Sequence, residues 1–283
     1  MTPTLNIVGA GHVGRTLGRL FAAHGVFAVQ DVLTRSTGSA AAAVSFIGAG
    51  RAVAQVAQVA QVAQLRPAQV WMLAVGDDQI APTCAALASA GLLDNATVFH
   101  CSGAKASNEL QAASRAGALV ASVHPVRSFA DPAGVAAAFA GTWCGVEGDA
   151  GALAQLAPAF EAIGAQLVTI DAAAKTVYHA ASVFASNYLV TVLDAALRAY
   201  TAAGVPVEVA RELARPLASE SLANVFRLGP AAALSGPVAR GDVATVTRQQ
   251  AAVSHWDAPT GRLYEALVEA TTLLAERKRR GEH

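Results

Sequence analysis

Short apolar runs and longer alanine-rich stretches alternate along the first 171 residues. The runs expected to form strands are TLNIVGA, VFAVQDVLTR, VSFIG, QVWMLAV, ATVFHCSG, ALVASVHP, TWCGVEG and AQLVTID. The segments between them are long enough for crossover helices. This alternation predicts an α/β fold with a parallel sheet.

After residue 171 the strand pattern stops. Long helical segments rich in Ala, Leu and Val follow, and they are broken at AAGVPVE, RLGPAAALSGPVARGD and HWDAPTG. Asp171 suits a helix N-cap, because its carboxylate can accept hydrogen bonds from first-turn N–H groups. We therefore expect two domains, an α/β domain over residues 1–171 and an all-helical domain over residues 172–283.

The segment VAQVAQVAQVAQ at residues 53–64 repeats every three residues. On a helix this period rotates each Val by about 60° from the previous one, so no continuous apolar face forms. We expect an Ala/Gln-rich helix between the third and fourth strands, and we assign it no chemistry.

Composition and charge narrow the class of ligand. With 54% hydrophobic residues among 283, the chain can bury a sizeable core. Twenty basic residues balance twenty acidic ones, so nucleic acid and anionic membranes are not expected, and a small molecule is the expected partner. Three scattered cysteines indicate neither disulfides nor a metal site. No apolar run approaches the roughly 18 residues of a membrane span, which predicts a soluble, cytoplasmic protein.

The segment LNIVGAGHVGRTLGRLF contains the spacing G-x-G-x-x-G at Gly9, Gly11 and Gly14, directly after a strand and at the start of a helix. Gly9 permits the tight turn, Gly11 lets the backbone approach a pyrophosphate, and Gly14 lets helix and strand pack closely. His12 and Val13 lie in the same turn and are expected beside the ligand. The position at the first strand–helix turn favours a dinucleotide site, although a scaffold that has lost its cofactor is the alternative.

The end of the second strand bears on the choice of cofactor. An acidic residue there would bind the ribose hydroxyls of NAD, but the sequence reads LTRST. Arg35 and the hydroxyl of Ser36 suit a 2′-phosphate, so NADP (NADPH) is the expected cofactor. Asp31 lies inside the strand and is less well placed. The alternative is that Arg35 only ends the strand in solvent.

Three later strand ends should lie at the same edge of the sheet, where open α/β folds bind their ligands. They contribute Gly76 in LAVGDD, Ser102 in FHCSGA and His124 in SVHPVRSF. Each could be an ordinary turn residue. Together they predict a polar rim around a nicotinamide, with Gly76 on the cofactor and Ser102 and His124 on the substrate side.

The helical segment KTVYHAASVFASNYL places Lys175, His179 and Ser182 on one stripe at about 100° per residue, with Asn187 off it. Only three of the twenty basic residues are lysines, so a lysine here is expected to serve a purpose that arginine does not. We expect Lys175 or His179 to handle a proton, and Ser182 and Asn187 to bind substrate. A core histidine and a solvated lysine are the alternatives. The rest of the helix, beyond its first turns, is expected to enter a core.

The glycine fingerprint, HCSGA, SVHPVRSF, YHAASVFASNYL and ALSGPVARGD occur in this order over nearly the whole chain. In this the sequence resembles a bacterial family of Rossmann-like NADP-dependent oxidoreductases with a helical C-terminal domain of unknown function. That family is similar to the 6-phosphogluconate dehydrogenase and β-hydroxyacid dehydrogenase group and, more distantly, to pyrroline-5-carboxylate reductase. The resemblance implies that Lys175 matches the catalytic lysine of the β-hydroxyacid relatives, and that His179 stands where they have asparagine.

These observations predict an NADP-dependent oxidoreductase that transfers hydride between nicotinamide and a small carbonyl, imine or alcohol. A non-catalytic NADP-binding sensor on the same fold is the alternative. Apolar residues on several faces of residues 180–226 predict a homodimer joined through the helical half. In ALSGPVARGD, Arg240 precedes an expected helix start at Asp242, where it could receive a substrate anion.

Overall fold

The computed structural model describes residues 1–54 and 64–281. The chain forms two compact units, Met1–Ala185 and Ser186–His283. The helix expected over the VAQ repeat lies almost wholly outside the described residues. Its first two residues, Val53 and Ala54, end a strand instead.

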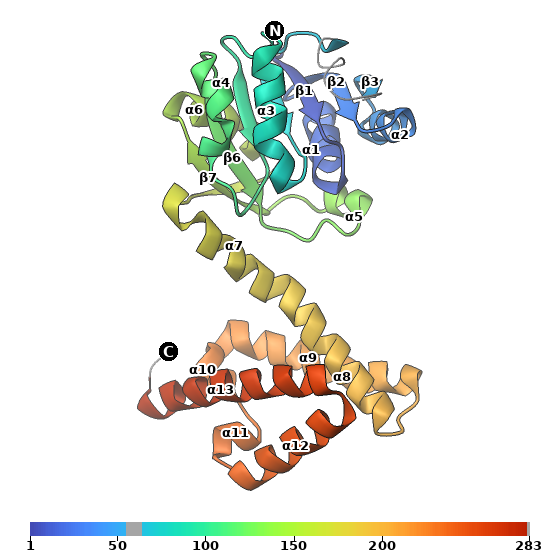
Figure 1. Ribbon diagram of the computed structural model, residues 1–283, viewed down its shortest axis with the longest axis vertical. Helices are drawn as coiled ribbons and strands as arrows, with labels where there is room; N and C mark the ends of the chain where they lie inside the picture. The colour runs from blue at the N-terminus through green and yellow to red at the C-terminus, as the bar shows by residue number, and fades with distance from the viewer. Residues whose placement is uncertain (55–63, 282–283) are drawn as a thin grey trace. The chain divides into compact units, whose positions relative to one another are not determined.

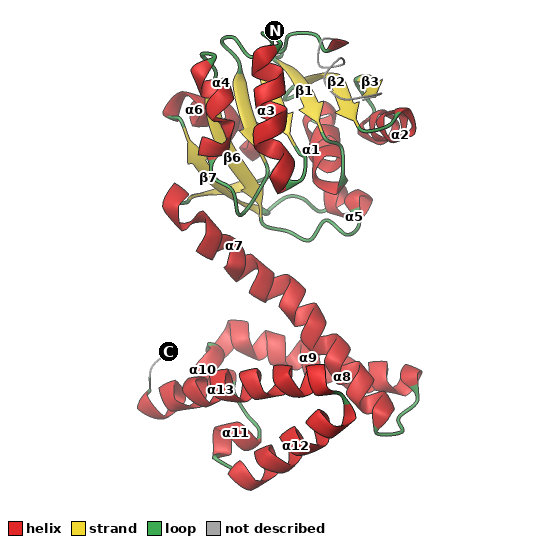
Figure 2. Cartoon of the chain, viewed as in Figure 1, coloured by secondary structure: helices red, strands yellow, loops and turns green. Residues whose placement is uncertain are grey.

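The first unit is a sheet with helices on both faces (Figures 1 and 2). Its strands are β1 (Thr4–Val8), β2 (Ala28–Thr34), β3 (Arg51–Ala54), β4 (Val70–Leu73), β5 (Thr97–His100), β6 (Leu119–Pro125), β7 (Trp143–Gly148) and β8 (Gln166–Thr169). Its helices are α1 (His12–Ala23), α2 (Thr37–Ile47), α3 (Ile80–Ser89), α4 (Gln111–Arg115), α5 (Pro132–Ala137), α6 (Ala150–Ala162) and α7 (Lys175–Val183). Short 3-10 turns are η2 (Asp77–Gln79), η3 (Ser107–Leu110) and η4 (Ala172–Ala174).

The strands of this sheet are ordered β3-β2-β1-β4-β5-β6-β7-β8. Neighbouring strands pair in parallel except β6 and β7, which are antiparallel. The chain moves outward from β1 to β3 and then returns to the other side of β1 with β4. This reversal between β1 and β4 is the switch point at which α/β sheets open a ligand crevice.

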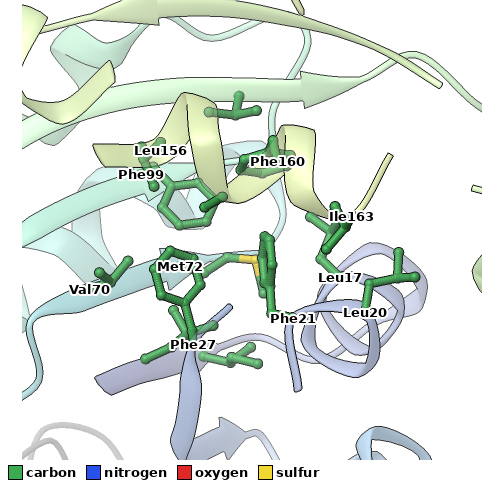
Figure 3. Close-up of a cluster of buried hydrophobic side chains, with 14 of the residues drawn as sticks. Leu17, Leu20, Phe21, Phe27, Val70, Met72, Phe99, Leu156, Phe160 and Ile163 are labelled. Atoms are coloured by element: carbon green, nitrogen blue, oxygen red, sulfur yellow. The ribbon is translucent and has the colours of Figure 1, made fainter. Parts of the chain in front are cut away.

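Alternating strand residues supply two separate cores. In β4, Val70 and Met72 point into one core, and Trp71 and Leu73 point into the other. The first core lies against α1, α2 and α6, where Phe21 meets Phe160 edge to face at 5.2 Å between ring centroids (Figure 3). The second core lies against α3 and α4. Because both faces are buried, the strands read as continuous apolar runs.

One predicted strand is wrong: VSFIG forms the last turn of α2. The alanine run before it continues a helix that Ser36 caps at its start, and Gly48 ends the helix with a left-handed φ of 81°. The third strand is formed by Arg51–Ala54 instead. The expectation of a parallel sheet holds for β1 to β6, whereas β7 and β8 both run in the opposite direction. Strand direction is set by tertiary pairing and leaves no local pattern in the sequence.

The second unit is helical over its described residues (Figure 2). Its elements are most of the π-helical turn η5 (Phe184–Tyr188), then α8 (Leu189–Ala202), α9 (Val207–Leu228), α10 (Pro230–Ala233), α11 (Pro237–Arg240), α12 (Val243–Trp256) and α13 (Ala258–Arg280). Arg198 of α8 reaches the start of α13, where it donates to Thr260 Oγ1 at 3.0 Å. The predicted fold class, a Rossmann-like domain followed by a helical region, is confirmed.

Two expectations concern the segment that leads from one unit into the other. Asp171 is a cap, as predicted, and accepts a hydrogen bond from Ala173 N at 2.9 Å. The first compact unit nevertheless extends to Ala185, so the domain boundary at residue 171 stays a prediction. The run Ala172–Ala202 contains an 18-residue window with a mean hydropathy of 1.4, so it is long and apolar enough to cross a membrane by length and composition alone. The expectation that no segment has this character is therefore wrong.

Candidate functional site

The turn between β1 and α1 can be built only with glycines at two positions. Gly9 has φ +84°, and a Cβ on it would lie 2.6 Å from the carbonyl oxygen of Ala74. A Cβ on Gly14 would collide with the carbonyl oxygen of Gly9 and the Cβ of Ala74. These two glycines let α1 pack closely against the ends of β1 and β4.

Gly11 differs from both, because a Cβ there would meet no atom within 4 Å. Gly11 is also the N-cap of α1, and no side chain caps that helix. The first-turn N–H groups therefore remain available to an anion, with His12 exposed and Val13 half-buried beside them. Open space over uncapped helix amides is the geometry that a dinucleotide pyrophosphate requires.

Arg35 lies exposed between the end of β2 and the start of α2. Ser36 caps α2 by accepting a hydrogen bond from Ser39 N at 3.2 Å, so its hydroxyl already has a structural task. Gly76 follows β4 at the same edge of the sheet and precedes the turn η2. These three predicted cofactor residues therefore follow strands at the carboxyl edge.

Asp31 is fully buried and serves a structural purpose. It binds Arg51 at 2.9 Å and Arg66 at 2.7 Å. Burial alone would raise the pKa of Asp31, but hydrogen bonds from Arg66 and Arg51 lower it below its ordinary value. A carboxylate held in this way is not free for ribose hydroxyls, which agrees with its exclusion from the predicted site.

Lys175 is the most unusual side chain of the first unit. It is only 1% exposed, and its Nζ donates to the carbonyl oxygen of Ser102 at 3.0 Å and to Ser122 Oγ at 2.6 Å. Among the described residues it forms no ion pair. Burial lowers the pKa of Lys175, while the charge of Glu147 acts in the opposite direction. A buried ammonium bonded only to neutral oxygens can release its proton more easily than an exposed lysine.

His124, at the end of β6, lies beside Tyr178 and His179 of α7. Its Nδ1 is 3.0 Å from the Tyr178 hydroxyl, and its ring centroid is 5.6 Å from that of His179. Burial, together with the positive charges of Lys175 and His179, lowers the pKa of His124 to about 4. His124 is therefore neutral at physiological pH.

Ser102 contributes its backbone more than its side chain. Its hydroxyl accepts hydrogen bonds from Ala104 N at 3.2 Å and Lys105 N at 3.0 Å, which closes the turn after β5. Its carbonyl oxygen binds Lys175. His100 fixes the same turn, because its Nδ1 accepts from Ser102 N and its Nε2 therefore donates to Ala106 O at 3.0 Å.

The structure thus brings Lys175, Ser102, His124 and His179 together within the first unit. It adds Ser122 and Tyr178, which the sequence interpretation missed. A signal for Ser122 was present, because it precedes His124 by two residues in a strand and so shares its face. Tyr178 had no comparable signal, because it lies off the stripe that Lys175 and His179 share.

The remaining predicted substrate residues are Ser182, Asn187 and Arg240. Ser182 lies half-buried on α7, whereas Asn187 and Arg240 belong to the second compact unit. Arg240 is exposed at the end of α11, shortly before Asp242 caps α12 by accepting from Thr245 N at 3.1 Å. Asn187 lies in the turn η5, whose π-helical geometry ends the regular stripe.

The helical segment that begins at Lys175 was expected to enter a core in its later part, and within the second compact unit this expectation is wrong. No residue of α8 is buried, and Phe184 is 69% exposed. The one fully buried side chain of α7 is Lys175, at its first position. The polar end of the segment is therefore the enclosed one, and the apolar end is open.

Two family models cover most of the chain. Residues 3–125 match a model described as a Rossmann-like domain, and residues 142–271 match a model described as a domain of unknown function (DUF2520). The chain thus combines a region similar to Rossmann-like domains with a region similar to DUF2520 domains. The family resemblance inferred from the sequence motifs is confirmed. A search of curated proteins gave no match.

Solved structures match over nearly their full length. The protein TM1727 from Thermotoga maritima is 26% identical, with a TM-score of 0.73, and the match covers 98% of this chain and 100% of that one. BF3122 from Bacteroides fragilis, which is assigned as an NADP oxidoreductase, has a TM-score of 0.76 at 19% identity, covering 95% and 98%. An imine reductase from Myxococcus stipitatus in complex with NADP⁺ has a TM-score of 0.62 at 16% identity, covering 99% and 96%. Pyrroline-5-carboxylate reductases also match, as the resemblance implied.

Proposed function

We propose that this protein is an NADP-dependent oxidoreductase that transfers hydride between nicotinamide and a small carbonyl, imine or alcohol. The observation that carries the proposal is that the glycine turn of β1 and the cluster around Lys175 and His124 lie at the same edge of one sheet. β1 and β6 are three strand spacings apart in that sheet, which is about 14 Å at ~4.8 Å per spacing. An extended dinucleotide bound at the turn can reach across that distance to the cluster.

The residues present fit such a cofactor. Gly11 leaves open space over the uncapped start of α1 for the pyrophosphate. Arg35 precedes the N-terminus of α2, so its guanidinium and the first-turn amides of α2 favour an additional phosphate at the ribose. When bound, the nicotinamide supplies or accepts a hydride.

The cluster supplies the groups that such a reaction needs from the protein. Lys175 can give or take a proton because burial lowers its pKa, and His179 is the alternative donor. His124 is neutral and orients the substrate by hydrogen bonding. Ser102 and Ser122 hold Lys175 in place through two oxygen atoms.

The test combines binding with turnover. NADPH should raise the melting temperature of the purified protein, because a ligand that binds only the native state stabilises it by mass action. A metabolite library should then be screened with saturating NADPH, and compounds that raise the melting temperature further should be assayed for NADPH oxidation.

Gly11→Val is the matched control for the binding step. Its new side chain meets no protein atom at Cβ but fills the space assigned to the pyrophosphate, so the variant should fold and lose the NADPH response. Equal responses in both proteins would contradict the assigned site. NADPH binding without turnover of any carbonyl or imine would favour the sensor alternative.

A further inference from the structure

The contact between His124 and Tyr178 requires a glycine on the neighbouring strand. His124 of β6 stands directly opposite Gly145 of β7 in the antiparallel register. A Cβ on Gly145 would overlap the hydroxyl oxygen of Tyr178. The two rings meet edge to face with an interplanar angle of 87°. Gly145 therefore makes room for the phenol to lie against the strand backbone and reach His124 Nδ1.

The environment of the phenol indicates which group donates the proton. Burial raises the pKa of Tyr178, so the hydroxyl stays protonated. Among the described residues, His124 Nδ1 is the one group with which the phenol oxygen forms a hydrogen bond, so the phenol proton has no other acceptor there. The atom within reach is His124 Nδ1, at 3.0 Å. A neutral imidazole that accepts at Nδ1 carries its own proton at Nε2.

The Nε2 edge of His124 faces Gly103, as does the ring of His179. In the described part of the chain, Nε2 has no hydrogen-bond partner. No fully enclosed side-chain nitrogen or oxygen among those residues lacks a partner, so Nε2 is not fully enclosed. A Cβ added at Gly103 would lie 2.8 Å from Nε2 and would also collide with the His179 ring. The absence of a side chain at Gly103 thus keeps the space between the two histidines open.

We propose that Tyr178 is a positioning residue that holds His124 as the Nε2–H tautomer, so that a neutral imidazole offers a hydrogen-bond donor to an acceptor atom of the ligand. Taking that ligand to be the substrate rests on the proposed function. The donor suits a carbonyl oxygen, a carboxylate or the lone pair of a neutral imine. It does not suit an iminium nitrogen, which has no lone pair to offer. His124 thereby selects among the substrate classes that the hydride reaction allows.

The tautomer can be measured without cofactor or substrate. In ¹⁵N-histidine-labelled protein near neutral pH, long-range ¹H–¹⁵N spectra distinguish a protonated Nε2 from a protonated Nδ1. The protein has seven histidines, and the His124 signals are identified by their loss in His124→Gln. We expect a single Nε2–H tautomer in the wild-type protein. A protonated Nδ1 at His124 would overturn the proposal whether or not the protein turns over any substrate.

Tyr178→Phe tests the role of the phenol, because it removes the hydroxyl and keeps the ring. The variant should give a mixture of tautomers at His124. Tyr264→Phe is the control, since that hydroxyl binds Gln249 in the other compact unit and its loss should leave His124 unchanged. An unaltered His124 spectrum in Tyr178→Phe would refute the positioning role. If Tyr178→Phe does not fold, the wild-type spectrum still decides the tautomer.

Once a substrate is known, two replacements of His124 give a kinetic test. Gln places an amide N–H near the position of Nε2, whereas Asn places one nearer to Nδ1. Loss of one hydrogen bond costs about tenfold, so His124→Gln should keep roughly tenfold more kcat/KM than His124→Asn. Equal losses in the two variants would contradict donation from Nε2.

Discussion

Replacing Lys175 by Met should remove activity without removing stability. The ammonium is 1% exposed and bonded to two neutral oxygens, so its removal leaves no unpaired buried charge. Ser122 Oγ still donates to the carbonyl oxygen of Ser102 at 3.3 Å, which keeps that acceptor satisfied. Met has a similar length and can occupy the same channel with apolar atoms.

The magnitude follows from two opposing contributions. The two hydrogen bonds from the ammonium contribute about 1.5–3 kcal/mol each, while the desolvation of a buried ion costs several kcal/mol. These nearly cancel, so Lys175→Met should change the free energy of unfolding by no more than about 2 kcal/mol near neutral pH. For a unit of this size that is at most about 8 °C in melting temperature. The same change should lower kcat/KM by roughly 100-fold or more, with NADPH affinity nearly unchanged.

The pH dependence of stability tests whether the pKa of Lys175 is lowered in the folded state. The folded pKa of Lys175 lies below its ordinary value of 10.5, so between those two values the unfolded chain binds more protons than the folded one. Wild-type stability therefore gains from Lys175 as pH rises through that window, whereas Lys175→Met has no such gain. The melting temperature of Lys175→Met relative to wild type should be highest near neutral pH and fall as the pH approaches 10.5.

Calorimetry of both proteins across pH, with Lys105→Met as control, tests this reasoning. Lys105 is partly exposed and paired with Glu109, whose hydrogen bond raises the pKa of Lys105, so its replacement should show no such fall. A parallel pH course for wild type and Lys175→Met would refute a lowered pKa. A large loss of stability at every pH would make Lys175 a structural residue, and full activity in Lys175→Met would move the proton transfer to His179.

Three further outcomes are expected. Arg35→Ala should erase most of the preference for NADPH over NADH, because the charge-assisted hydrogen bonds of Arg35 to the 2′-phosphate would contribute about 1.5–3 kcal/mol. Arg115→Ala, at the opposite edge of the sheet, is the control and should leave the preference unchanged. Unchanged relative affinities of Arg35→Ala in calorimetric titration would contradict the assignment. The protein should be a homodimer by light scattering at micromolar concentration, because α9 leaves Leu217 60% and Phe226 87% exposed; a monomer would refute this. Arg240→Ala should raise KM for an anionic substrate with little change in melting temperature, whereas lost stability with unaltered kinetics would make that loop structural.

The sequence predicted the sheet well where local pattern and tertiary environment agree. Strands buried on both faces, such as β4 and β5, appear as short apolar runs between turn residues, and nothing else competes for those runs. The failure at VSFIG has a clear cause. Its β-branched and aromatic residues suggest a strand, but helix α2 had already started at Ser36 and had no stop signal before Gly48.

The candidate site was predictable where the backbone itself is the constraint. Gly9 and Gly14 are fixed by turn geometry, and that geometry belongs to a recognisable local motif. Ser102 was predicted as a substrate-side residue at a strand end, whereas its contact with Lys175 uses the carbonyl oxygen, which every residue type possesses. Tyr178 depends on contact between α7 and β7, and Gly145 becomes meaningful only once that contact is known. Contacts between distant segments leave no spacing in the sequence.

Lys175 occupies the first position of α7, where a positive charge is unfavourable, and this favours a functional role for the lysine. Burial opposes its charge, and so does the positive end of the helix dipole at which it stands. A residue needed only to fill space would be more stable as an apolar side chain, and one needed only for charge would be more stable in solvent. The two oxygens of Ser102 and Ser122 compensate part of this cost and hold Nζ in one place. Proton transfer requires an ionisable group whose charge is destabilised and whose position is fixed. For that reason we favour Lys175 over His179 as the proton donor.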